Sequence, residues 1–178
     1  MTFKTHIVSS LVVGLATAKY LGNHIGLHIH SDFEFSIYLL AVAFGAVFPD
    51  IDEPNSFIGR KFGIFSQIFS TFFKHRGITH TVIIILFYLG VLSLFVLAYY
   101  SNPLYKIAGI GFVVGNIGHI LGDSSTKSGV PLLYPLYDKN FGILPKRFRY
   151  VTGGTIEYVF VLPAFLMILT YQFFGILK

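Results

Sequence analysis

The sequence contains no cysteine, which excludes both disulfide bonds and thiolate metal sites. It also has few charged residues, 12% of the chain, about half the usual share for a soluble protein. Hydrophobic residues make up 54% of the 178 residues, and 20 residues are phenylalanine. A water-soluble domain of this size could not bury so much apolar surface. The composition therefore predicts a single integral membrane domain over residues 1–178.

Two common hydrolase motifs are also missing. The chain has no HExxH motif, which excludes the usual zinc protease site, and no GxSxG turn, which excludes the usual serine hydrolase site. A net charge of +5 is compatible with nucleic-acid binding, but in a membrane protein it more often reflects basic residues that face the cytoplasm and anionic lipid. We therefore expect membrane lipid, and no nucleic acid, as a partner.

Five hydrophobic segments predict an all-α, polytopic bundle of about five transmembrane helices. Residues 81–100 and 158–177 each form a run of 20 residues without a formal charge, long enough to cross a hydrocarbon core of roughly 30 Å. The other three segments, 6–22, 35–48 and 107–122, are shorter or richer in glycine, which is typical of helices enclosed in a bundle. We interpret the first segment as a retained span rather than a signal peptide.

A further helix is predicted between the second and third spans. Apolar residues recur there at steps of four, three, four and three, at Ile58, Phe62, Phe65, Phe69 and Phe72, with basic residues at both ends. This spacing predicts a short amphipathic helix lying on the membrane interface. A core helix packed on the bundle has the same pattern and is the alternative.

The distribution of basic residues predicts the orientation of the bundle. The amino terminus, the segment between the second and third spans and the segment between the fourth and fifth carry most of the basic residues, which are Lys4, Arg60, Lys61, Lys74, Arg76, Lys127, Lys139, Lys146, Arg147 and Arg149. Basic residues near membrane spans favour the cytoplasmic side. These three regions are therefore expected to face the cytoplasm.

Potential metal ligands occur at the same predicted ends of the spans. They come from five separate segments and are His6, Asp50, Asp52, His75, His80, His119, Asp123 and Glu157. His119 and Asp123 are four residues apart and would lie on one face of a helix. Imidazole and carboxylate ligands favour one or two ions of zinc, with manganese or iron as alternatives. In contrast, His24, His28 and His30 fall in the opposite loop and are expected to be interfacial or solvated.

The order of these motifs resembles a known family. PDIDEPNS, HRGITH, GHILGDSSTKSGVPLLYPL and TGGTIE occur in that order over nearly the whole chain. They resemble the YdjM-like family of bacterial inner-membrane proteins, described as LexA-regulated, membrane-bound, metal-dependent hydrolases. The resemblance implies metal dependence and hydrolysis at a bacterial inner membrane.

A more distant similarity concerns the ligand order. His, Asp, His and then HxxxD resembles the zinc-dependent phospholipase C and P1 nuclease group, which is all-helical. That resemblance implies one ion held by Asp50, His80, His119 and Asp123, and a second held in part by His6 and Asp123. The group also has a later HxxxE pair, but this chain has Gly153 at the position of the histidine. This departure leaves Glu157 as a lone ligand or as a residue behind the ligands.

The expected function is a membrane-embedded, phospholipase-like hydrolase of a phosphoester, most plausibly a lipid or lipid-linked substrate. Asp52 is the expected general base or bridging ligand. Arg76, with Lys74 or Lys127, is expected to bind a phosphate, because arginine presents a bidentate fork to oxyanions. Two alternatives stay open: a metal-binding transporter or channel, and a non-catalytic membrane scaffold. Transporters usually place ionisable residues near the bilayer midplane, whereas these residues gather at one end.

Overall fold

The computed structural model describes residues 1–72, 78–98 and 102–176. Helices dominate these residues, in the order α1 (Phe3–Leu21), α2 (Asp32–Val47), the 3₁₀ helix η1 (Phe48–Asp52), α3 (Phe57–Phe62), α4 (Ile64–Phe72), the 3₁₀ helix η2 (Ile78–His80), α5 (Val82–Ala98), α6 (Pro103–Ser124), the 3₁₀ helix η3 (Lys146–Phe148), the π-helical turn η4 (Glu157–Val161) and α7 (Leu162–Ile176). Within these ranges β pairing is limited to two isolated bridges, Thr126 with Tyr150 and Val130 with Phe141. The predicted all-α fold is confirmed.

Three helical stretches are long and apolar enough to cross a membrane. They are Asp32–Asp52, Pro103–Ser124 and Glu157–Gly175. The fourth apolar helix, α5, is shorter, with 17 described residues, and the 19-residue α1 is not among the three. Helices therefore form at all five predicted positions, three of them with the length and hydropathy of a span.

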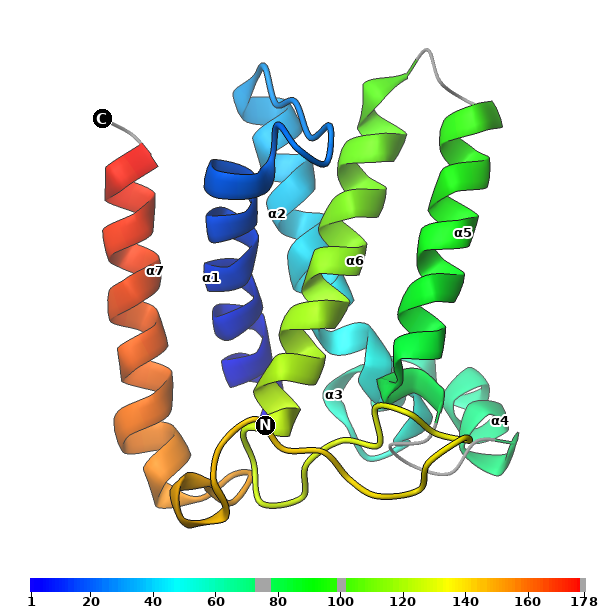
Figure 1. The fold of residues 1–178 in the computed structure, drawn as a ribbon, viewed down its shortest axis with the longest axis vertical. Coiled ribbons are helices and arrows are strands. Elements are labelled where there is room, and N and C mark those ends of the chain that lie inside the picture. The colour runs from blue at the N-terminus through cyan, green and yellow to red at the C-terminus, as the bar shows by residue number, and fades with distance from the viewer. Residues whose placement is uncertain (73–77, 99–101, 177–178) are drawn as a thin grey trace.

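Helix α6 is the centre of the bundle and packs against α1, α2 and α5 (Figure 1). Its apolar side chains Ile107, Ile110 and Val114 form a buried core with Tyr38 and Val42 of α2. In contrast, α7 packs against α1 at the edge of the bundle, and no residue of its most apolar stretch is buried. The enclosed position of α6 agrees with its moderate hydropathy and its many glycines.

Glycines let α6 approach its neighbours at backbone distance. A Cβ atom added at Gly115 would overlap the carbonyl oxygen of Val42, and one added at Gly45 would overlap that of Phe112. A Cβ atom at Gly118 would lie 2.5 Å from the Ser10 hydroxyl of α1. Small residues at these crossings are typical of close helix packing in membranes. The crossings fix the positions of α1, α2 and α6 near the end that carries His119.

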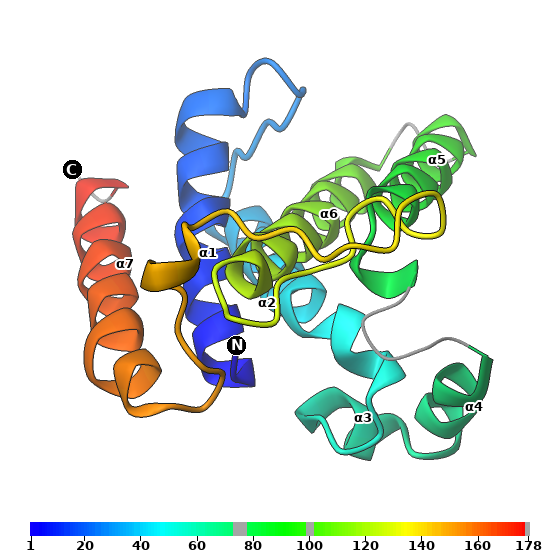
Figure 2. The same cartoon turned by 60° about the horizontal axis from the view of Figure 1, so that its bottom comes forward.

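The predicted amphipathic helix is present but divided into two. Gly63, with a φ of 44°, separates α3 from α4, and both lie beneath one end of the bundle (Figure 2). Ile58 of α3 is buried against Val47 and Ile51, whereas the apolar side chains of α4 are exposed: Ile64, Phe65 and Ile68. The first helix therefore packs on the bundle, and the second offers an apolar face. The Phe69 and Phe72 side chains lie outside the described residues.

Candidate metal centre

Four elements bring histidine and aspartate side chains together at one end of the bundle. His6 lies on α1, Asp50 on η1 and His80 on η2, while His119 and Asp123 lie one turn apart on α6. This is the end at which the chain begins, where α1, α2 and α6 meet the short helices (Figure 1). Four of the five side chains are at most 1% exposed: His6, His80, His119 and Asp123. Ionisable groups buried inside a membrane bundle are costly and usually functional.

The spacing of the ligand atoms matches that of a coordination sphere. His80 Nε2 lies 3.1 Å from His119 Nε2. Asp50 Oδ1 lies 3.8 and 3.6 Å from these two nitrogens, and Asp123 Oδ2 lies 3.8 and 4.0 Å from them. Ligand atoms of a tetrahedral zinc ion lie roughly 3.3 Å apart, given zinc–nitrogen distances of about 2.0 Å. Two imidazoles thus face each other between two carboxylates.

Hydrogen bonds on the far side of each ring orient these imidazoles. The carbonyl oxygen of Ala46 lies 2.7 Å from His119 Nδ1, and because a carbonyl can only accept, Nδ1 carries the proton. Thr79 Oγ1 donates to Asp52 Oδ2 at 2.5 Å and lies 2.9 Å from His80 Nδ1. The threonine proton is therefore already in use, so His80 Nδ1 donates to the Thr79 oxygen. Such partners fix the tautomer of metal-binding histidines.

The Nε2 lone pairs of His80 and His119 therefore point toward each other. With both Nδ1 atoms protonated as donors, both Nε2 atoms are acceptors, and they lie only 3.1 Å apart. Two acceptors at this distance repel each other unless a positive charge lies between them. A proton or a metal ion can supply that charge, and the carboxylates of Asp50 and Asp123 on either side favour it.

His6 extends the cluster on the side of Asp123. Its Nε2 lies 3.2 Å from Asp123 Oδ1, and its ring stacks on that of His119 with the ring centroids 3.7 Å apart. The residues form two potential metal-binding groups, one of His80, His119 and Asp123 and one of His6, Asp50 and His119, with the ligand atoms of each group within 4.8 Å of one another. His119 belongs to both groups. The same Asp123 oxygen also makes an ion pair with the amino group of Met1.

The carboxylates of Asp52 and Glu157 accept hydrogen bonds outside the two potential metal-binding groups. Asp52 is 1% exposed and lies behind His80, where it accepts the Thr79 hydrogen bond. Glu157 Oε1 accepts hydrogen bonds from the Thr2 amide and hydroxyl at 2.7 and 2.8 Å, and Oε2 accepts one from the Gly153 amide at 2.8 Å. Neither carboxylate belongs to the two potential metal-binding groups. Glu157 instead joins the start of α1 to the start of the last helix.

Of the basic residues expected to bind a phosphate, the structure describes Lys127. Lys127 is exposed on the segment after α6, and its backbone amide donates to the Tyr150 carbonyl at 2.9 Å. Arg76, Lys74 and His75 lie outside the described residues. Tyr150 itself is buried, and burial together with the charges of Glu157 and Asp123 raises the pKa of its phenol. The Tyr150 side chain therefore stays neutral beside the cluster.

Sequence reasoning did not identify the groups that orient the histidines. Ala46 acts through its backbone carbonyl, which no side-chain pattern can show. Thr79 had a visible signal, because it directly precedes His80 in the ITH segment. The Met1 amine was also missed, since it reaches Asp123 only through the tertiary fold.

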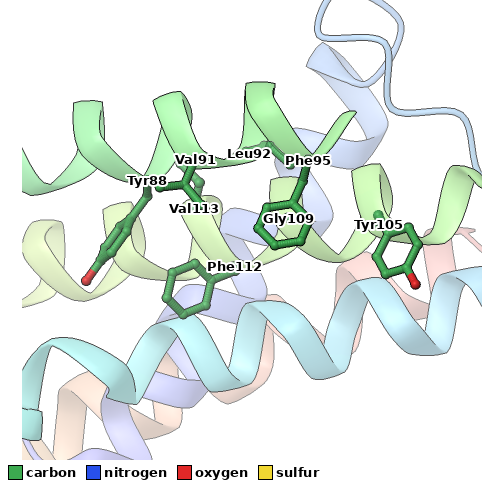
Figure 3. Close-up of a pocket in the computed structure, with 8 residues that line it drawn as sticks. All are labelled: Tyr88, Val91, Leu92, Phe95, Tyr105, Gly109, Phe112 and Val113. Carbon is green, nitrogen blue, oxygen red and sulfur yellow. The ribbon is translucent and has the colours of Figure 1, made fainter. Parts of the chain in front are cut away.

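An apolar pocket lies between α5 and α6, from the level of Tyr88 and Phe112 to that of Phe95 and Tyr105, toward the end away from the metal centre. It has a volume of about 190 Å³ and is lined by side chains of α5 and α6, with the rings of Tyr88, Phe95, Tyr105 and Phe112 along its length (Figure 3). Phe48, the first residue of η1, packs its ring near Tyr88 and Phe112, at centroid distances of 6.2 and 5.2 Å. The pocket thus shares an aromatic wall with the short helix that carries Asp50.

Comparison with known proteins agrees with the membrane architecture. The chain is 33% identical over 135 residues to the uncharacterized protein YvsG of Bacillus subtilis, an alignment that covers 76% of this chain and 74% of YvsG. It is 38% identical over 87 residues to the inner membrane protein YdjM of Escherichia coli, covering 49% of this chain and 43% of that protein, and the match to YdjM of Shigella flexneri has the same extent. No solved structure matches the chain. Residues 1–177 match the family described as YdjM inner membrane protein, and the chain therefore belongs to this family of membrane proteins.

Proposed function

We propose that this protein is a membrane-embedded, metal-dependent hydrolase that acts on the phosphoester of a lipid. The observation that carries the proposal is the pair of Nε2 atoms of His80 and His119, which face each other as acceptors at 3.1 Å. Two carboxylates lie around them, and the site is closed by buried residues from separate helices. Such an arrangement costs stability unless a cation occupies it.

The donor set fits a divalent ion. Imidazole nitrogens with carboxylate oxygens, without thiolates, favour zinc and also suit manganese or iron. His80, His119 and Asp123 would hold one ion, and His6, Asp50 and His119 form an alternative group for it, because His119 has only its Nε2 free to bind metal. A bound ion of this kind acts as a Lewis acid toward a phosphoryl oxygen and neutralises charge on the leaving oxygen.

Neighbouring residues orient the two imidazoles, and Asp50 connects the site to the surface. Asp52 and Thr79 keep the His80 ring in one tautomer, and Ala46 does the same for His119. The Asp50 side chain is 20% exposed, unlike the other four members of the cluster. Substrate therefore approaches from the side of Asp50, where the carboxylate can also accept a proton from an attacking water. Asp52 acts as a positioning residue rather than as the base.

Two features favour a lipid substrate at the cytoplasmic surface. The apolar pocket between α5 and α6 can hold part of an acyl chain (Figure 3), and α4 offers the exposed side chains of Ile64, Phe65 and Ile68 at the end of the metal centre. The segment after α6 lies at this end as well (Figure 2) and carries Lys127, Lys139, Lys146, Arg147 and Arg149. Basic residues next to spans favour the cytoplasmic side.

A transporter is the less favoured alternative. The two potential metal-binding groups lie at the end of the described bundle, in the last turns of α6 and the first turns of α1. Transport sites usually lie near the midplane on interrupted helices. The π-helical turn η4 interrupts the start of the last helix, but its Glu157 is engaged with Thr2 and Gly153.

The proposal is tested by measuring metal content and hydrolysis on the same samples. Detergent-purified wild type is compared with a His119→Ala, Asp123→Ala variant and with His24→Ala, which removes an exposed histidine from the opposite end. Each sample is assayed in mixed micelles for release of phosphate or headgroup from bacterial phospholipids. We expect near-stoichiometric metal and chelator-sensitive release in wild type and His24→Ala, and neither in the double variant.

Two outcomes contradict the proposal. Wild type that holds metal yet releases nothing from phospholipids or soluble phosphoesters is a metal-binding protein without this activity. The second outcome is wild type that holds no metal, either as purified or after incubation with zinc, manganese or iron. In that case a shared proton lies between the two imidazoles, and metal catalysis has no basis.

A further inference from the structure

A large cavity runs along the bundle toward the end opposite the metal centre. An apolar groove with a volume of about 740 Å³ runs between α1, α5 and α6, a size within the usual range for ligand pockets. Thr17 of α1, Leu89 and Val96 of α5, and Ile110 and Ile117 of α6 are among its lining residues. It extends from the level of Ile117 toward the start of α6, at the upper end of Figure 1.

One positively charged side chain, that of Lys106, lies at the outer end of this groove. Lys106, in the first turn of α6, lines it together with Ile25 from the connection between α1 and α2. Among the residues that the structure describes, no carboxylate forms an ion pair with Lys106. The start of a helix is also the positive end of its dipole. An apolar groove thus ends in a positive charge that lacks a counter-ion from the described chain.

Gly26, in the connection between α1 and α2, lies directly beside the Lys106 ammonium group. Gly26 has a φ of 66°, and a Cβ atom added there would lie 2.6 Å from Lys106 Nζ. Most side chains disfavour this backbone conformation, and any of them would displace the ammonium group. Gly26 therefore leaves room for the Lys106 ammonium group at the mouth of the groove.

A smaller, polar pocket continues from the same lysine. It has a volume of about 240 Å³, shares Lys106 and Val96 with the groove, and is also lined by His28, His30 and Asn102. The nearby Glu34 is already engaged, because its Oε2 accepts a hydrogen bond from the His30 amide at 2.6 Å. The lining of the two cavities thus changes along the bundle axis from apolar side chains to a lysine and polar side chains. This is the order of chemical groups in an amphiphile with an anionic head.

We propose that these cavities bind one anionic phospholipid, with an acyl chain in the groove and the phosphate at Lys106, His28 and His30. The cation lies one helical turn inside the end of α6, which is the depth of the headgroups for a spanning helix. Charge complementarity distinguishes this occupant from a neutral lipid. The site is independent of the proposed hydrolase activity, because it lies at the other end of the bundle.

The test measures lipid binding by native mass spectrometry of the full chain released from neutral detergent. The protein is titrated with phosphatidylglycerol and with phosphatidylcholine of the same acyl chains. We expect wild type to prefer the anionic lipid by about fivefold, as for one basic residue near a membrane surface. Lys106→Gln should bind both lipids equally, while Lys19→Gln, which removes an exposed lysine from the same end, should keep the preference.

A second variant separates lipid recognition from misfolding. Gly26→Ala keeps every charge but displaces the Lys106 ammonium, so it should lose the preference for phosphatidylglycerol in part. A monodisperse elution profile and an unchanged thermal unfolding temperature in detergent show that each variant is folded. Equal binding of the two lipids by wild type, or an equal loss in Lys19→Gln and Lys106→Gln, would overturn the proposal. A dimer that excludes lipid would assign the groove to a second copy instead.

Discussion

The two ends of the bundle each carry three described histidines in very different surroundings. His6, His80 and His119 are at most 1% exposed, and two of them point their Nε2 atoms at each other. At the other end, His24, His28 and His30 are exposed on one connection. The same residue type is thus buried and convergent at one end and solvated at the other. Convergence from separate helices, rather than local histidine density, distinguishes the candidate metal centre.

The cause of the difference is helix packing. The buried histidines come from elements far apart in the chain, which meet because Gly45, Gly115 and Gly118 allow α1, α2 and α6 to approach closely. The exposed histidines belong to one short segment between α1 and α2. A composition-based search would select the HIGLHIH segment, which is not the end at which the histidines converge.

The largest expected effect is loss of metal when His119 is removed. His119→Ala deletes the residue shared by both potential metal-binding groups, so we expect bound metal to fall from near-stoichiometric to background. His24→Ala, an exposed histidine at the other end, should retain the full amount. Inductively coupled plasma mass spectrometry of both purified variants checks this contrast. Equal metal in the two variants would remove the distinction between the ends.

The packing account predicts a large effect at Gly115. Gly115→Ala places a methyl group against the Val42 carbonyl, and overpacking of this kind costs about 1–3 kcal/mol. Gly90→Ala is the matched control, because nothing lies within 4 Å of a Cβ atom there. The control should be neutral or slightly stabilising, since alanine favours a helix more than glycine does. Thermal unfolding in detergent measures both, and a stable Gly115→Ala variant would refute the close crossing.

A smaller effect is expected from the residue that orients His80. Thr79→Val keeps the side-chain shape but removes the hydroxyl between His80 Nδ1 and Asp52 Oδ2. Loss of such a partner typically lowers metal affinity by about 10–100-fold. Competition with a zinc chelator measures the affinity, with Thr170→Val on the exposed side of α7 as the control. Unchanged affinity would show that the Thr79 hydroxyl does not orient the ring.

The smallest effect on metal is expected at Glu157. Glu157→Gln weakens the hydrogen bonds to Thr2 and Gly153, which should destabilise the protein by about 1–3 kcal/mol. Metal content should stay at the wild-type level, because Glu157 belongs to neither group. Thermal unfolding and metal analysis on one preparation separate these effects. Metal loss without loss of stability would instead make Glu157 a ligand.

Sequence reasoning predicted much of the fold because the bilayer imposes a simple rule. Long apolar segments form helices, and all five predicted segments are helical in the structure. The break at Gly63 was not predicted, because the apolar spacing continues unchanged across it, and only a positive φ separates α3 from α4.

The candidate site was predictable in part. His6, Asp50, His80, His119 and Asp123 were selected because they lie at the same predicted ends of the spans, and the structure brings them together. Proximity along the chain does not predict side-chain direction, and for this reason the position of the Asp52 carboxylate was not predicted. Asp52 lies two positions after the candidate ligand Asp50, yet η1 turns its carboxylate toward Thr79 behind His80. Glu157 was likewise selected for its position in the sequence, whereas its partners are the amides of Thr2 and Gly153 and the Thr2 hydroxyl, which only the tertiary fold brings to it.

The most direct test of the central claim is X-ray diffraction at the zinc absorption edge from crystals of zinc-loaded protein. We expect an anomalous peak between His80 Nε2 and His119 Nε2, within reach of the Asp50 and Asp123 carboxylates. A peak beside His28 and His30, or an empty space between the two Nε2 atoms under saturating zinc, would contradict the account.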